Sequence, residues 1–137
     1  MRRLALIAVL ALGLALGLAA CGGSGAPKDA LKIKFGRTGG MIVPYVITIA
    51  PDGAVTATGN PPVTPPTSLT SAQVETLSRQ VRNGIGKHTN LQCAHTFPDE
   101  ASNFITALGK TVAVRGMCEP GFTQLFDALT NALQRNQ

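Results

Sequence analysis

The chain has 137 residues, with twelve basic and seven acidic side chains and a net charge of +5 at neutral pH. Its basic residues are scattered rather than clustered, which argues against a nucleic-acid-binding surface. Aromatic residues are only 4% of the chain, with no tryptophan and one tyrosine, so the exposed aromatic platforms typical of carbohydrate-binding proteins are not expected.

Segment 1–20 is typical of an export signal. Arg2 and Arg3 come before an unbroken apolar run, Leu4 to Leu18, and small residues then lead to Cys21. Fifteen residues rise only about 22 Å as a helix, which is shorter than a bilayer span requires. We therefore expect this segment to be removed rather than kept as a transmembrane helix.

The residues at the cleavage point, Leu18-Ala19-Ala20-Cys21, resemble the lipobox of bacterial lipoproteins. The resemblance implies that Cys21 is the lipidation site, that cleavage occurs before it, and that the new amino terminus is acylated, for example by palmitate. It also implies a lipid-anchored chain on the extracytoplasmic face of the cell membrane. In a Gram-negative cell it would be the outer membrane, because Gly22 rather than aspartate follows. Two other routes remain open: an ordinary secretory signal, which leaves Cys21 as a free thiol, and a twin-arginine signal, whose polar flanking residues are absent.

After the signal, segment 21–30 is a flexible tether and segment 31–137 has the size of a single domain. Loss of the signal leaves ten basic against seven acidic side chains. Cys93 and Cys118 then form an even pair in a compartment that permits oxidation, so we expect a disulfide between them. The closed loop stabilises the fold by about 3 kcal/mol on the chain-entropy model.

The first half of the domain has the pattern of an antiparallel meander. Residues 31–35 alternate between apolar side chains and lysines, which predicts a half-buried strand. A second strand is expected over 41–50, which is apolar at every odd position. The turn residues Pro51-Asp52-Gly53 then predict a hairpin into a third strand over 54–58.

A loop and a helix are expected next. Four prolines in residues 60–66 predict an extended loop, which is either a recognition segment or a rigid connector. Thr70 and Gln73 predict a helix start with a capping box, and Gly84 and Gly86 predict its end. The buried stripe of this helix is expected at Val74, Leu77 and Val81.

The second half repeats the order of strands followed by a helix. An irregular connection over 87–100 leads to two short strands, 103–107 and 111–115, and Pro120 suits the first position of a final helix. The buried face of that helix is expected at Phe122, Leu125, Phe126, Leu129 and Leu133. The sequence therefore predicts an α+β domain with an antiparallel sheet of four to five strands and two helices packed on one face, in the order β-β-β-α-β-β-α. Its core is expected to include all five phenylalanines.

Candidate metal ligands do not form a known motif. His88, Cys93, His95 and Cys118 can be drawn as a zinc set, but their spacing is not that of a zinc site, and a disulfide would remove both thiolates. We therefore expect no metal, and we expect both histidines on a solvated loop.

Candidate catalytic residues are equally weak. Asp99 and Glu100 are adjacent carboxylates, a pattern more typical of turn or capping chemistry than of an acid/base pair. The sequence contains no nucleophile elbow and no phosphate-binding loop. Neither an enzymatic activity nor a cofactor is expected.

Arg37-Thr38-Gly39-Gly40 at the end of the first strand, the Pro-Asp-Gly turn and the order of the helices are similar to the small emfourin-type inhibitors of thermolysin-like metalloproteases. The likeness covers most of residues 31–135 in layout, and it is close in letters only over 37–40. After Gly40, Met41-Ile42-Val43 departs from the family pattern. The resemblance implies that the partner-contact residues are Thr38, Gly39, Gly40 and Met41.

The proline loop adds further candidate partner contacts, Pro61, Pro62, Pro65 and Pro66. Together these features favour a non-enzymatic binding module that is anchored to a membrane through Cys21 and holds a protein partner. An emfourin-like protease inhibitor is one specific form of this function. A small exported hydrolase and a structural envelope protein are the alternatives that the sequence leaves open.

Overall fold

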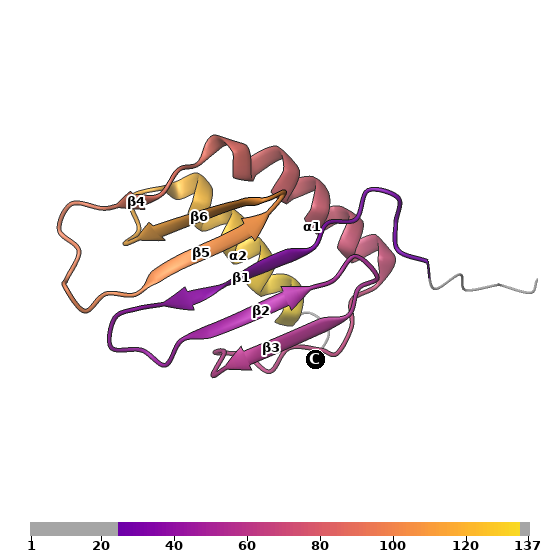
Figure 1. Cartoon of the computed structure of the whole chain (residues 1–137), viewed down its shortest axis with the longest axis horizontal. Coiled ribbons are helices and arrows are strands. Elements are labelled where there is room, and N and C mark those ends of the chain that lie inside the picture. Colours follow the sequence, from indigo (N-terminus) through magenta and orange to yellow (C-terminus); the bar gives the residue numbers. More distant parts are fainter. Residues whose placement is uncertain (1–24, 135–137) are drawn as a thin grey trace, which may run out of the picture.

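Six strands form one mixed sheet, and two helices lie against one of its faces (Figure 1). The computed structural model describes residues 25–134, so segment 1–20 and Cys21 lie outside the described residues. The strands are β1 (Ile33–Thr38), β2 (Tyr45–Ile49), β3 (Val55–Gly59), β4 (Leu91–Gln92), β5 (Ser102–Ala107) and β6 (Lys110–Arg115). The helices are α1 (Ser71–Gly84) and α2 (Pro120–Gln134), and a 3₁₀ turn, η1 (Ile85–Lys87), directly follows α1.

Strand β1 joins the two halves of the domain. The spatial order is β3-β2-β1-β5-β6-β4, and β1 pairs antiparallel with both β2 and β5. Phe35 of β1 lies opposite Ile47 on one side and Ile105 on the other, so apolar residues of three strands share one face of the sheet. The predicted α+β class is confirmed.

The sheet has more strands than predicted and is not purely antiparallel. Strand β4 pairs in parallel with β6, with Leu91 opposite Val114. A two-residue strand is too short to show an alternating pattern in the sequence. It is held instead by its surroundings, because the Cys93 N–H donates to the Arg115 carbonyl at 2.9 Å and Cys93 is bridged to Cys118. The predictions of four to five antiparallel strands and of an irregular connection over 87–100 are corrected accordingly.

The second strand is shorter than predicted. It begins at Tyr45 rather than at residue 41, and Met41 is 85% exposed. Gly39 and Gly40 have φ angles of 72° and 66°, and Pro44 lacks an N–H donor, so the chain leaves the sheet as a loop over this stretch. The apolar odd positions are buried only within β2 itself.

The core lies between the helices and the sheet. The predicted buried residues of both helices are buried, and the Phe35 ring packs edge-on against Phe126 with centroids 5.8 Å apart. Phe104, which precedes the buried Ile105, lies half-buried on the other face of β5, and Phe97 is 73% exposed. The prediction that all five phenylalanines fill the core is therefore wrong, because only Phe35, Phe122 and Phe126 do so.

The start of α1 confirms the predicted capping box. The Gln73 N–H donates to the Thr70 hydroxyl at 3.3 Å, and the Thr70 N–H donates to Gln73 Oε1 at 2.9 Å. Leu69 and Val74, on either side of the cap, are both buried. Within residues 25–134, neither helix is long and apolar enough to cross a membrane.

Candidate functional site

Three loops meet at the end of the sheet where β1 and β6 terminate. They comprise residues 39–44, 93–101 and 116–119, and we name them together the distal loop end. Figure 1 shows the β1–β2 and β4–β5 loops at this end, opposite the end at which β1 begins. Three of the sequence-predicted contacts, Gly39, Gly40 and Met41, lie here, directly after Thr38 at the end of β1.

Hydrogen bonds to the main chain hold these loops to one another. The Met41 N–H donates to the Asp99 carbonyl at 3.1 Å. The Arg115 guanidinium, at the end of β6, donates to the carbonyls of Pro98 at 2.7 Å and Glu100 at 2.8 Å. Segment 98–100 is therefore fixed from both sides, by the first loop and by β6.

The disulfide ties the third loop to the second. Cys93 and Cys118 are bridged with their Cα atoms 5.6 Å apart, which confirms the predicted pairing. Cys93 is buried and Cys118 is exposed. The bridge connects the residue after β4 to the residues just before α2, so the second and third loops cannot separate without breaking it.

The loops display large apolar side chains to solvent. Met41 is 85%, Met117 is 81% and Phe97 is 73% exposed, and Val43 is 63% exposed. Covering such side chains with a partner gains about 25 cal/mol for each Å² of apolar surface removed from water. Met41 was among the contacts predicted from the sequence, but Phe97 and Met117 were not, because isolated apolar residues in loops produce no periodic pattern.

The four candidate metal ligands do not form a metal site. Both cysteines are oxidised in the bridge, and within residues 25–134 no group of three or more His, Cys, Asp or Glu side chains is arranged to hold a metal ion. His95 is exposed, as predicted. His88 is half-buried, with Nδ1 3.4 Å from Glu119 Oε1 and its ring edge-on to Phe122. The prediction of a solvated position is wrong for His88, because it packs against the start of α2.

Asp99 and Glu100 contribute their main chain to the distal loop end. Their carbonyl groups accept the hydrogen bonds from Met41 and Arg115, and the Glu100 N–H donates to the Phe97 carbonyl at 3.0 Å. The last of these bonds closes a turn. The observed role of this pair is therefore to shape the loop.

The proline loop lies along an edge of the sheet. The Val55 N–H donates to the Thr67 carbonyl at 2.9 Å, and because β3 ends at Gly59, residues 60–66 must run back beside this strand. Prolines at an edge strand prevent further strand pairing. Among the predicted contacts, Pro61, Pro65 and Pro66 are half-buried and Pro62 is exposed.

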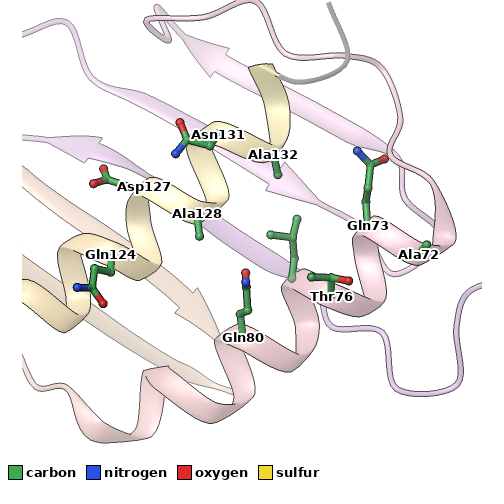
Figure 2. Close-up of a pocket in the computed structure, with 10 residues that line it drawn as sticks. Ala72, Gln73, Thr76, Gln80, Gln124, Asp127, Ala128, Asn131 and Ala132 are labelled. Atoms are coloured by element: carbon green, nitrogen blue, oxygen red, sulfur yellow. The ribbon is translucent and has the colours of Figure 1, made fainter.

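A groove of about 610 Å³ runs between α1 and α2 on the outer side of the helical layer. Leu77 and Ala128 contribute apolar surface, and Gln80, Gln124 and Asp127 contribute polar groups. Figure 2 shows Gln80 extending from α1 toward α2. This groove was not predicted from the sequence, because it depends on how α1 and α2 pack in three dimensions.

Comparison with known proteins gave no relatives for this chain: no protein-family model matches it, and no curated protein or solved structure is similar to it.

Proposed function

We propose that this chain is a lipid-anchored, extracytoplasmic binding module that holds a protein partner at its distal loop end and catalyses no reaction. The observation that carries the proposal is the group of exposed apolar side chains on loops that hydrogen bonds and a disulfide fix in place. Exposed apolar clusters mark interaction surfaces, and a preformed surface loses little conformational entropy on binding.

The position of the tether supports this proposal. The chain enters β1 at Ile33, twelve residues after Cys21, and β1 runs directly toward the distal loop end. Residues 25–32 therefore lead into the end of the sheet opposite the distal loop end (Figure 1). The described part of the tether therefore does not cover the distal loop end, and a partner can reach it.

The resemblance to emfourin-type inhibitors gives the proposal a specific form, inhibition of a thermolysin-like metalloprotease. The supporting observation is that Met41, directly after the Gly39-Gly40 pair, is the most exposed large apolar side chain of residues 25–134. A protruding loop of this kind fits the concave cleft of an enzyme.

The other candidate functions have less support. A hydrolase that uses His88, His95, Asp99 and Glu100 needs these side chains around one hollow, and none of them lines the groove between the helices. A structural envelope protein differs from a binding module in its deletion phenotype, because its loss weakens the whole envelope and not the activity of one partner.

The anchor is tested by mass spectrometry of the mature protein. We expect the mature chain to begin at Cys21 with a lipid attached, and we expect Cys21→Ser to release the chain from the membrane fraction. An unmodified Cys21 thiol on a processed chain would contradict the anchor.

The binding surface is tested by partner crosslinking and by inhibition of a purified thermolysin-like protease. Met41→Asp and Phe97→Asp each place a charge in the proposed contact, and we expect either change to weaken binding at least tenfold. Both assays use the purified chain without membranes, and Leu108→Asp is the matched control there, because Leu108 is also an exposed apolar residue but lies in the turn at the opposite end of the sheet. Equal losses in all three variants would reject the distal loop end as the contact.

A further inference from the structure

A second hollow lies at the end of the sheet from which the tether leaves. It has a volume of about 310 Å³ and is formed by the start of β1 and the turn between β5 and β6, with Leu31, Lys32, Lys34, Thr106 and Leu108 in its lining. Lys34 and Thr106 are direct neighbours in the pairing of β1 with β5. Figure 1 shows this turn beside the start of β1.

The hollow carries unbalanced positive charge. Lys32 and Lys34 are both exposed, and Lys34 lies between the buried Ile33 and Phe35, so it belongs to the sheet face that the helices leave open. Within residues 25–134, neither ammonium group has a carboxylate partner, and none of the acidic residues of that part lies on a strand. This end of the sheet therefore favours an anionic ligand.

Leu108 occupies an unusual position beside these lysines. It and Gly109 form the two-residue turn between Ala107 and Lys110, with φ angles of 54° and 71°. A turn with two positive φ angles favours asparagine, aspartate or glycine at its first position, and leucine is strained there. The side chain is nevertheless 55% exposed, so packing in the core does not explain the choice of leucine.

We propose that this hollow binds the headgroup phosphate of an anionic phospholipid. Lys32 and Lys34 contact the phosphate, and Leu108 inserts at the boundary between the headgroups and the acyl chains. Basic residues close to a membrane attract anionic headgroups, and exposed leucines insert beside them. The inference rests on the proposed lipid anchor at Cys21, which lies eleven residues before Lys32, a reach of about 35–40 Å. The contact holds the anchored domain upright, with the distal loop end pointing away from the membrane.

The test measures the depth of residue 108 in the bilayer. The chain has no tryptophan, so Leu108→Trp provides a single fluorescent reporter. The test uses the chain from Cys21 onward, which keeps every residue of the described core. Because Cys93 and Cys118 are bridged, Cys21 is its one free thiol. Coupling Cys21 to a maleimide lipid attaches the chain to vesicles whether or not cells acylate it. A failure of this test is thereby distinguishable from a failure of the proposed anchor.

In vesicles of phosphatidylglycerol whose acyl chains are brominated near the headgroup, we expect quenched and blue-shifted tryptophan emission. In brominated phosphatidylcholine vesicles we expect little quenching. Lys32→Gln and Lys34→Gln should each lower, about fivefold, the ratio of domains whose hollow contacts the bilayer to domains whose hollow does not. The control variant combines Arg79→Gln with Lys87→Gln, on α1 and η1, and so removes as much charge as Lys32→Gln and Lys34→Gln combined, but away from the hollow; it should leave quenching unchanged.

Three outcomes overturn the proposal. The first is equal quenching in both lipids, and the second is an equal loss of quenching in the Arg79/Lys87 control variant and in the lysine variants. The third is a loss of quenching when millimolar inorganic phosphate is added at constant ionic strength. The last outcome would mean that the hollow takes free phosphate. A second reporter, Thr111→Trp, separates lipid contact from turn structure, because Thr111 is exposed near the same turn and does not line the hollow. In that background Leu108→Asn should raise thermal stability, because asparagine suits the turn, and should reduce quenching. Unchanged quenching would remove Leu108 from the contact.

Discussion

Gly39 and Gly40 are neighbours with similar positive φ angles, yet only Gly40 lacks room for a side chain. A Cβ on Gly40 would meet the Asp99 carbonyl oxygen and would lie 2.8 Å from Ala101 N. A Cβ on Gly39 would have no heavy atom within 4 Å. The pair therefore separates the cost of backbone strain from the cost of lost loop packing.

We expect Gly39→Ala to lower the free energy of unfolding by about 1 kcal/mol, the cost of an alanine in the left-handed region. Gly40→Ala should cost about 2 kcal/mol more, because segment 99–101 must move away. Chemical denaturation measures both values, and amide exchange at Met41 reports whether its hydrogen bond to Asp99 is lost. Equal costs for the two variants would contradict the close contact at Gly40.

Tyr45 is the residue whose titration couples to folding. Burial raises the pKa of its phenol above the ordinary value near 10, and the Arg37 charge partly opposes the shift. Between the unfolded and the folded pKa the folded chain binds more protons than the unfolded chain. The contribution of Tyr45 to stability should therefore be constant below about pH 10 and should be lost as the pH rises further.

Tyr45→Phe removes this titration. We expect the free energy of unfolding of the variant to fall less steeply above pH 10 than that of the natural chain, and to have the same slope below pH 9. Urea denaturation at a series of pH values measures the difference. Identical slopes above pH 10 would show that burial does not perturb the phenol.

Among the elements, β4 depends most on the disulfide. It has two residues, and its neighbour Cys93 is joined to Cys118 across a separation of 25 residues. We expect Cys93→Ala with Cys118→Ala to lower the free energy of unfolding by about 3 kcal/mol. The loss should appear first as rapid amide exchange over 91–101, and reducing agent should have no effect on the double variant. A natural chain whose melting temperature is insensitive to reduction would contradict this role.

The helices need no such support. The capping box at Thr70 and the apolar face of α2 are local patterns, and both were predicted with their residues correct. A helix repeats every 3.6 residues, so its buried face appears in the sequence as apolar residues spaced three or four positions apart. The two-residue β4 is too short to show a pattern, and the loop over 41–44 carries a strand-like alternation that the preceding glycines and Pro44 override.

At the scale of the whole molecule, β1 makes the domain a single folding unit. It comes from the first half of the chain and pairs with β5 from the second, and both helices cover the same core. We expect one cooperative transition in calorimetry, with equal calorimetric and van't Hoff enthalpies. A fragment ending at residue 69 should not fold alone, because β1 would lose β5 and the core would lose both helices. Two resolved transitions would contradict this view.

The sequence by itself determined the α+β class, the order of the main strands and helices, the capping box of α1, the two hairpins and the cysteine pairing. It also led to the expectation of a lipid anchor at Cys21. These features depend on residues close together in the chain, or on residue types with very few partners to choose from. Hydrophobic periodicity, turn residues and an even pair of cysteines all carry such information locally.

The tertiary structure alone decided which loops meet. Nothing in the letters around Met41, Phe97 and Met117 links them, because they are brought to one end only when β1 pairs with β5 and the disulfide closes beside β6. The same pairing places Leu108 next to Lys32 and Lys34 at the opposite end. Contacts between strands distant in sequence have no local signature, so both ends of the domain acquire their surfaces from the sheet order.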